Sequence, residues 1–332
     1  MSVTIYDLAK KAGVSISTVS KALNDSYSIS DETKERIKEL ADEIGYRPNV
    51  RAKSFATQKN GIVLFAADLS RGVGFENPHL FEIVTGIERY LDEKGYSLIL
   101  KHVEKKESDV KIRELMLAEQ ADGVILHVSI LSHKLSSILV KESLPHLVIG
   151  KPDFGSRACW IDISHEAAGQ LAADYLLDKG YGKILFMMGD RNLDGISQRR
   201  LKGLLGPIEE EQLPIEIIDN ITTIDKARAA MTKMFERKEL PEVVLSTNNY
   251  LALGCMQCLR EKNLEIPKDI AIMTFDNYPF SMILEPTLTA VEVDMYEMGN
   301  QAGRFILQKI KNPNLQTQSF CTTPLIIERE ST

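Results

Sequence analysis

The stretch T-I-Y-D-L-A-K-K-A-G-V-S-I-S-T-V-S-K-A-L-N, residues 4–24, predicts two short helices joined by a tight turn. Thr4 and Asp7 have the spacing of a capping box, in which each side chain bonds the backbone N–H of the other residue. Gly13 suits the end of the first helix, and Ser15 can cap the second. Apolar residues follow at helical spacing, at Ile5, Leu8, Ala9 and Ala12 and then at Val19, Ala22 and Leu23. Two helices around a turn that contains glycine are the plan of a helix-turn-helix.

The outward face of the second helix is short, polar or cationic. It carries Ile16, Ser17, Thr18, Ser20, Lys21 and Asn24. Lysine can reach guanine acceptors in the major groove, hydroxyls can reach a base or a phosphate, and an apolar side chain can meet a thymine methyl. A solvated polar face would have the same composition, so this pattern alone leaves the two interpretations equal.

A third helix is predicted from its cap at Ser30 to Gly45, with apolar residues at Ile37, Leu40, Ala41 and Ile44. These residues would close a small three-helix domain. Pro48 disfavours helix at the residue before it, and Asn49 can cap a further short helix, V-R-A-K-S-F-A-T-Q. We therefore predict a head over residues 1–47 and a linker helix over 48–59.

The charge is divided unevenly along the chain, whose formal net charge is −7. Residues 1–59 contain ten Lys and Arg against eight Asp and Glu, so this segment has a net charge of +2 and the other 273 residues have −9. The acidic balance of the whole chain therefore does not argue against a basic face on the head.

Length and composition indicate a multidomain globular protein. A chain of 332 residues exceeds the size of one growing core, and 44% hydrophobic with 26% charged residues is ordinary. The first residues lack a secretory signal, and no run of about 18 apolar residues occurs, so we expect a cytoplasmic protein without a membrane anchor. The four cysteines include a C-x-x-C at Cys255 and Cys258, which we interpret as two apolar helix residues because no second pair or histidine cluster is near.

From Gly61 onward, short apolar runs alternate with amphipathic helices. The predicted strands are I-V-L-F-A-A-D, S-L-I-L-K, D-G-V-I-L-H-V, H-L-V-I-G, C-W-I-D, K-I-L-F-M-M, E-V-V-L-S-T and I-A-I-M-T-F. Repeated strand and helix predict parallel sheets covered on both faces. So many strands predict two doubly wound lobes with a ligand between them.

The chain resembles the LacI/GalR (lactose-repressor) family along its whole length. The resemblance rests on residues 4–24, on S-D-E-T-K-E-R-I-K-E-L-A-D-E-I-G-Y-R-P-N and on later motifs such as A-D-G-V-I-L, Q-R-R-L-K-G, T-N-N-Y-L-A-L-G and E-P-T-L-T-A-V. It implies an α-helical helix-turn-helix head, a hinge helix, and an α/β effector region of two lobes like those of periplasmic binding proteins. The implied N-lobe covers 60–161 plus about 291–321, and the C-lobe 162–290 plus about 322–332.

The resemblance also implies the mode of DNA contact. The hinge helix of the family enters the minor groove, where a leucine wedges between base pairs. Phe55 stands at that position here, and Lys53 stands where arginine is usual. The full set expected to contact DNA is Ile5, Tyr6, Ser15, Ile16, Ser17, Thr18, Ser20, Lys21, Asn24, Asn49, Ala52, Lys53 and Phe55. The expected target is a pseudo-palindromic operator bound by a homodimer.

Three polar residues stand at the family's ligand positions. Arg200 can give two parallel hydrogen bonds, Asp276 can accept from hydroxyls, and Asn248 can donate and accept. Without the resemblance, a surface ion pair or a turn would be the favoured interpretation of each. His79, Phe75 and Trp160 are added as candidate ligand contacts, although packing is the favoured role for a single aromatic residue.

Several positions depart from the family pattern. His79 and Leu80 replace an aromatic pair, Gly150 replaces a usual Asp, and Asn249 replaces the Asp of a common N-D. Ile163 and Val293 replace a frequent Asn and Gln, and residues 71–76 form an extra segment. The ligand is thus expected to be a sugar or a related small metabolite, whose identity remains open, as does the choice between induction and co-repression.

The sequence disfavours two other function classes. An enzyme is disfavoured because the phosphate-binding G-x-x-x-x-G-K-[ST] and the nucleophile motif G-x-S-x-G are absent, and the histidines lack metal-ligand spacing. No cofactor and no metal are therefore predicted. A transport receptor is disfavoured by the attached head and the missing signal peptide.

Overall fold

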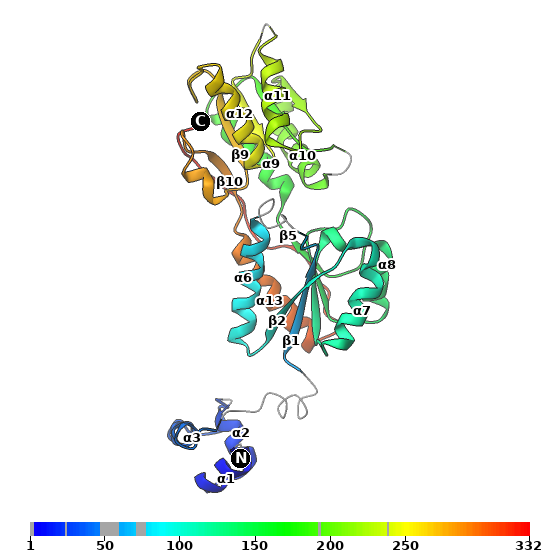
Figure 1. Cartoon of the computed structure of the whole chain (residues 1–332), viewed down its shortest axis with the longest axis vertical. Coiled ribbons are helices and arrows are strands. Elements are labelled where there is room, and N and C mark those ends of the chain that lie inside the picture. The colour runs from blue at the N-terminus through cyan, green and yellow to red at the C-terminus, as the bar shows by residue number, and fades with distance from the viewer. Residues whose placement is uncertain (1–2, 24, 47–59, 71–77, 192–193, 238) are drawn as a thin grey trace. The chain divides into compact units, whose positions relative to one another are not determined.

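The computed structural model describes residues 3–23, 25–46, 60–70, 78–191, 194–237 and 239–332. The chain divides into two compact units, Met1–Gly61 and Ile62–Thr332. The first unit contains α1 (Ile5–Ala12), α2 (Ile16–Leu23) and α3 (Asp31–Glu43), coloured blue in Figure 1. The predicted three-helix head is confirmed, whereas the predicted hinge over 48–59 lies outside the described residues.

Local hydrogen bonds explain where the head helices begin and end. Asp7 Oδ2 accepts from the Thr4 backbone N–H at 2.9 Å and Thr4 Oγ1 accepts from Asp7 N–H at 3.4 Å, which is the predicted capping box. Gly13 has φ +66° and ends α1, a conformation that costs glycine little. The three helices bury a common core that includes Leu8, Val19 and Ile37.

The second unit contains two parallel-dominated sheets. The N-lobe sheet has the order β11-β5-β4-β3-β1-β2, with all neighbours parallel. Its strands are β1 (Ile62–Ala67), β2 (Ser97–His102), β3 (Gly123–His127), β4 (His146–Ile149), β5 (Trp160–Asp162) and β11 (Gln318–Phe320). Helices α6 (His79–Glu93) and α13 (Met295–Lys311) cover one face, while α7 (Ser108–Ala118) and α8 (His133–Lys141) cover the other (Figure 1).

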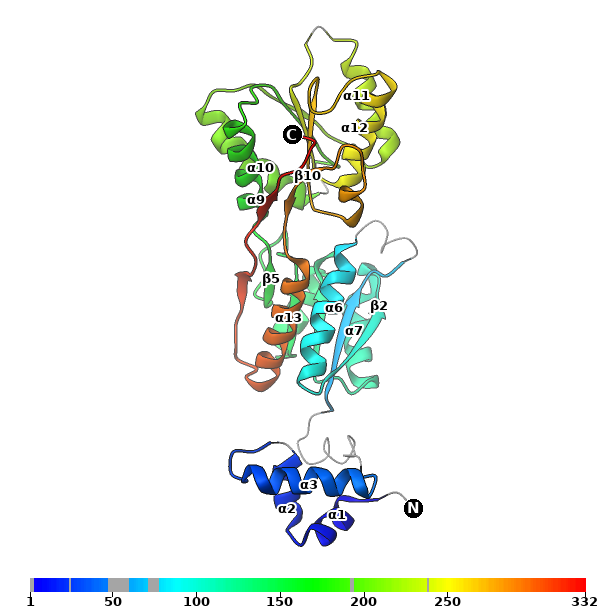
Figure 2. The same cartoon turned by 90° about the vertical axis from the view of Figure 1, so that its left-hand side faces the viewer.

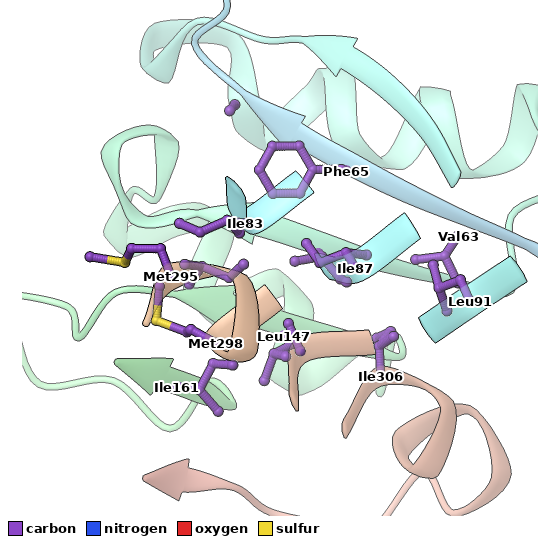
Figure 3. Close-up of a cluster of buried hydrophobic side chains, with 14 of the residues drawn as sticks. Val63, Phe65, Ile83, Ile87, Leu91, Leu147, Ile161, Met295, Met298 and Ile306 are labelled. Atoms are coloured by element: carbon purple, nitrogen blue, oxygen red, sulfur yellow. The ribbon is translucent and has the colours of Figure 1, made fainter. Parts of the chain in front are cut away.

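The core between the N-lobe sheet and its α6–α13 face draws on distant segments. Figure 3 shows Phe65 of β1, Ile87 of α6 and Met298 of α13 in one core with Leu147 of β4 and Ile161 of β5. Figure 2 shows α6 and α13 side by side, although they are separated by some two hundred residues of sequence. Their approach is close because Gly86 and Gly299 face the opposite backbone, where a Cβ atom would overlap with a carbonyl oxygen.

The C-lobe sheet has the order β12-β10-β9-β8-β6-β7, and only β12 is antiparallel to its neighbour. Its strands are β6 (Ile184–Met187), β7 (Ile215–Ile218), β8 (Val243–Ser246), β9 (Ala271–Phe275), β10 (Thr289–Glu292) and β12 (Leu325–Ile327). Helices α9 (His165–Asp178) and α10 (Gly195–Glu210) cover one face, and α11 (Ile224–Met234) and α12 (Asn249–Glu261) the other. Short 3-10 turns lie at Lys105–Glu107, Val128–Ile130 and Pro279–Met282.

The chain passes between the lobes three times, after β5, after β10 and after β11. The eight quoted strands and the two-lobed α/β architecture are confirmed. Cys255 and Cys258 are buried in α12, as their interpretation as helix residues requires. Within the described ranges, no helix is long and apolar enough to span a membrane.

Candidate functional site

A cavity of about 260 Å³ lies between the two lobes and is called the interlobe cavity below. The N-lobe contributes the start of α6 and the segments after β3 and β4, and the C-lobe contributes the starts of α9, α10 and α12 and the segment after β9. The carboxyl ends of parallel strands and the amino ends of helices therefore meet here, which is the usual ligand position in doubly wound sheets.

Arg200 and Asp276 form a buried ion pair on the C-lobe wall of the interlobe cavity. Arg200 Nη2 donates to Asp276 Oδ1 at 2.6 Å, while Nη1 reaches Oδ2 at 3.4 Å and the Thr247 carbonyl oxygen at 2.8 Å. The guanidinium carbon lies 4.7 Å from the centre of the Phe275 ring. Burial would raise the pKa of Asp276, but the charge of Arg200 and the nearby His79 holds that pKa well below its ordinary value.

Asn249 positions Asp276 and was not among the sequence-predicted site residues. Its side-chain amide donates to the carbonyl oxygens of Phe275 and Asp276, and Ser281 Oγ donates to its Oδ1. Asp276 has φ +67°, a conformation that is unusual for a residue other than glycine. The bonds from Asn249 hold this turn, so the carboxylate of Asp276 is presented to Arg200.

Asn248 caps α12, so only part of its side chain is available for the predicted hydrogen bonds to a ligand. Its Oδ1 accepts from the backbone N–H groups of Tyr250 at 3.0 Å and Leu251 at 3.1 Å. The acceptor is thus occupied by the helix, and the amide NH₂ is the group that remains for the cavity. We predicted both a donor and an acceptor here, and sequence alone did not reveal the cap.

His79 connects the N-lobe with the C-lobe. Its Nδ1 lies 3.4 Å from Glu82 Oε2, and its Nε2 lies 3.7 Å from Asp276 Oδ1 across the interlobe cavity. Its ring meets the Tyr278 ring edge-on at 5.0 Å. Burial would lower the pKa of His79, but the carboxylates of Asp276 and Glu82 raise it to about 9. The imidazole is therefore protonated at neutral pH.

A second polar cluster, at Asp162, His165 and Arg199, was not predicted. Asp162 accepts from the backbone N–H groups of Lys151 and Ile163, both at 2.8 Å. His165 Nε2 lies 3.6 Å and Arg199 Nη2 3.8 Å from its carboxylate oxygens. Burial lowers the pKa of His165, so this ring is neutral at neutral pH. The sequence feature that could have indicated this cluster is the position of Asp162 and His165 at and just after the end of β5, where the chain passes into the C-lobe.

Gly150 explains one departure from the family pattern. It has φ +98°, and a Cβ atom there would overlap with the side chain of Val128. The backbone at this cavity position thus requires glycine in this chain.

The remaining candidate ligand contacts lie elsewhere. Trp160 does not line the interlobe cavity. Its ring packs edge-on against Phe320 at 5.4 Å, and Lys151 Nζ lies 5.8 Å from its centre. Trp160 therefore packs within the N-lobe, as favoured for a single aromatic residue. Phe75 lies outside the described residues.

Six of the eight predicted DNA contacts that lie within the described residues of the head are exposed to solvent. Tyr6, Ser15, Ile16, Ser17, Ser20 and Lys21 are exposed, and Thr18 is half-buried. Ser15 Oγ accepts from Thr18 N–H at 3.1 Å and so caps α2. Ile5 differs, because it is half-buried and packs against the head core. Asn24, Asn49, Ala52, Lys53 and Phe55 lie outside the described residues.

The cations of the head differ in their partners. Lys11 pairs with Glu43 at 2.7 Å and Lys38 with Asp25 at 2.6 Å. Lys21, in the last turn of α2, has no ion pair within the described part of the chain. It is therefore free to contact an external anion or a base edge.

No group of three or more potential metal ligands from His, Cys, Asp and Glu is found among the described residues.

Comparison with known proteins supports the two-unit interpretation. Residues 4–49 match the family described as "Bacterial regulatory proteins, lacI family", and residues 173–332 match "Periplasmic binding protein-like domain". The chain is 30% identical over 337 residues to the HTH-type transcriptional repressor PurR of Vibrio atlanticus, covering 99% of this chain and 98% of that protein. It is also 30% identical over 342 residues to the HTH-type transcriptional regulator DegA of Bacillus subtilis, covering 100% and 98%.

Solved structures share the fold. The lac repressor dimer bound to operator and the anti-inducer ONPF has a TM-score of 0.73 at 22% identity, covering 100% of this chain and 99% of that one. The complex of transcriptional regulator CelR with cellobiose has a TM-score of 0.71 at 22% identity, covering 99% and 100%.

Proposed function

The chain belongs to the lacI family of bacterial regulatory proteins, and from this membership we propose that it is a cytoplasmic repressor whose operator affinity is set by a small molecule in the interlobe cavity. Its relatives are named as transcriptional repressors and regulators, so the chain is a DNA-binding transcription regulator and not an enzyme.

Helix α2 is the proposed recognition helix. Its exposed face, from Ser15 to Lys21, offers hydroxyls, one apolar side chain and the Lys21 ammonium group, which has no ion pair in the described part of the chain, to the major groove. Tyr6 and Ile5 at the start of α1 would lie near the DNA backbone. The predicted contacts of Asn24 and of the linker, including Asn49, Ala52, Lys53 and the Phe55 wedge, remain part of the proposal.

The interlobe cavity is the proposed effector site, and the observation that carries this assignment is the buried Arg200–Asp276 pair on its wall. Asn248 and His79 complete the proposed contacts. A sugar or related metabolite is the proposed effector class, in keeping with the cellobiose complex of the similar regulator CelR. We keep the predicted lobe limits as part of the same proposal.

Coupling would run through the angle between the lobes. His79 belongs to the N-lobe and Asp276 to the C-lobe, so a ligand that contacts both stabilises one relative arrangement of the lobes. A homodimer on a pseudo-palindromic operator would transmit this change to paired hinge segments.

The proposed operator reading can be tested by selecting binding sites for the purified full-length chain from a pool of random DNA. We expect enrichment of two related half-sites in inverted orientation, because a twofold dimer presents two identical heads. A selected pool that carries a single, unrepeated half-site would contradict the dimeric arrangement.

The proposed effector role can be tested with Asp276→Asn, which keeps the size of the side chain and removes its charge. We expect the variant to bind the operator as the wild type does and to lose the response to any effector that shifts the wild type. A variant that stays fully responsive would refute the assignment of the interlobe cavity.

A further inference from the structure

The carboxylates that line the interlobe cavity already accept hydrogen bonds from the chain. Asp276 accepts from Arg200, and Asp162 accepts from the backbone of Lys151 and Ile163. Asp194 caps α10 and accepts from the backbone N–H and the hydroxyl of Ser197. Each of these six carboxylate oxygens therefore has a donor within the protein.

The donors that line the same cavity are in surplus. Arg200 Nε and His79 Nε2 are buried and have no hydrogen-bond partner within the described residues. Among the described residues, the one ion pair of Arg199 is with Asp162 at 3.8 Å, and the capping role of Asn248 uses its Oδ1 and not its Nδ2. These donors come from α6 in the N-lobe and from α10 and α12 in the C-lobe.

Among the buried side-chain atoms that line the described part of the cavity and have no hydrogen-bond partner, His165 Nδ1 is the one acceptor. The hydroxyls of Thr247 and Tyr278 also line the cavity and can donate as well as accept. His165 is neutral and its Nε2 faces Asp162, so the single ring proton belongs on Nε2 and the buried Nδ1 is left as an acceptor. A neutral sugar hydroxyl brings a proton that must find an acceptor. The oxygens of a carboxylate or a phosphate bring none, and they form shorter and stronger bonds to guanidinium and imidazolium donors.

Size narrows the ligand further. The interlobe cavity of about 260 Å³ lies below the range of about 300–1,000 Å³ that is common for drug-sized ligands. It therefore suits a metabolite with a single ring or a short chain better than an oligosaccharide.

We propose that the interlobe cavity selects a small anionic metabolite, whose carboxylate or phosphate oxygens are bound by Arg199, by Arg200 Nε and by His79. This inference rests on the proposed effector role of the cavity and names the chemical class of the effector. Carboxylate and phosphate share the required chemistry, and the experiment separates them.

The test compares matched ligands on the full-length chain by calorimetric titration. The ligand sets are D-glucose, D-glucuronate and D-glucose 6-phosphate, the corresponding galactose series, and D-ribose with D-ribonate and D-ribose 5-phosphate. Inorganic phosphate alone reports adventitious anion binding. We expect at least one acid or phosphate to bind at least tenfold more tightly than its neutral parent and than inorganic phosphate.

A charge-matched pair of variants locates the site. Arg199→Gln removes the partly exposed cation that lines the cavity, and Lys202→Gln removes a cation from the same helix that pairs with Glu166 outside it. We expect Arg199→Gln to weaken the anionic ligand at least tenfold and Lys202→Gln to leave its affinity unchanged. Equal affinities in the wild type and Arg199→Gln would overturn the proposal.

The other outcomes distinguish the anionic class of the ligand from the effector role of the interlobe cavity. Neutral sugars that bind as tightly as their acids and phosphates, or a complete lack of binding by the acids and phosphates, would overturn the anionic class. In the first case a shift in operator affinity by the neutral sugar would leave the effector role intact. An anion that binds through Arg199 without changing operator affinity would support the anion site and refute the effector role.

Discussion

His79 predicts a pH dependence of stability that can be worked out from its surroundings. Its pKa is raised to about 9 in the folded chain, against 6.5 for an ordinary histidine, because the Asp276 and Glu82 carboxylates flank the ring. A group whose pKa is raised on folding stabilises the folded state below its unfolded pKa, and this stabilisation is lost as the pH rises through the folded pKa. The window therefore runs from about pH 6.5 to about pH 9.

The magnitude follows from the shift of the pKa. Raising the pKa from 6.5 to about 9 corresponds to about 3 kcal/mol of unfolding free energy, since each tenfold change in proton affinity is worth about 1.36 kcal/mol. The side chain of His79 is only 10% exposed, so solvent screens its attraction to Asp276 little, whereas Glu82 is about half exposed and contributes less. Most of the loss should occur between about pH 7 and about pH 9.5.

Urea unfolding at about pH 7 and about pH 9.5 measures this loss of unfolding free energy. Trp160 is the single tryptophan of the chain and lies in the second unit, so its fluorescence reports on the unit that contains His79. We expect the unfolding free energy of the wild type to fall by about 2 to 3 kcal/mol more than that of His79→Gln. Both chains share a further fall above about pH 8.5, because burial raises the pKa values of the Cys255 and Cys321 thiols in the folded state. The histidines His127, His146 and His165 have lowered pKa values, so their contributions change below pH 6.5 and not in this window.

A matched control uses His133, an exposed histidine on α8 that stacks on Phe154. His133→Gln should retain the pH profile of the wild type. A flat profile in the wild type, or an equal fall in His79→Gln, would refute the assignment of a charged His79 between the lobes.

Three further predictions concern packing and binding. Gly203→Ala should destabilise the chain by about 1–3 kcal/mol or more, because the added Cβ would overlap with the Glu166 carbonyl oxygen. Gly206 lies on the same helix, and a Cβ added there meets nothing within 4 Å. Gly206→Ala should therefore be neutral or stabilising by up to about 1 kcal/mol, and thermal unfolding of both variants measures the difference. Lys21→Ala should weaken operator binding by about 1–3 kcal/mol, and the size of this loss should depend on the identity of one base pair. Fluorescence anisotropy on a set of single-base operator variants measures it. An equal loss on all variants would instead indicate a phosphate contact. Asn249→Ala should weaken effector binding without changing operator affinity, because it frees the turn that presents Asp276, and calorimetric titration that finds wild-type affinity would contradict this positioning role.

The elements that sequence predicted well depend on contacts within a few residues. The capping box at Thr4 and Asp7 joins residues three apart, and the end of α1 at Gly13 depends on one backbone conformation. The eight quoted strands are apolar runs bounded by turns, and each can be predicted without knowing which strands lie beside it in the sheet. Strands β7, β10, β11 and β12 were not among them, and β7, β11 and β12 carry no fully buried residue, so an apolar run does not mark them.

The site shows what local patterns could not determine. Asn248 and Asn249 are adjacent and chemically identical, yet one caps α12 and the other holds the Asp276 turn. Nothing in their sequence separates these roles, because the difference arises from which neighbour each side chain meets after β8 and β9 have paired. Trp160 likewise ends in packing against Phe320 of β11, a strand far along the chain.

Sequence by itself thus determined the family, the three-helix head and the two α/β lobes, and it proposed Arg200 and Asp276 for a ligand site; the structure pairs these two residues on the wall of the interlobe cavity. Only the tertiary structure added His165 and Arg199 to the cavity that His79 lines, left Arg200 Nε and His79 Nε2 without hydrogen bonds among the described residues, and used the Asn248 oxygen for a helix cap. The reason is physical: helix caps and apolar periodicity are short-range interactions, whereas the balance of donors and acceptors in a cavity depends on groups that meet only after two sheets have formed and the chain has crossed between them.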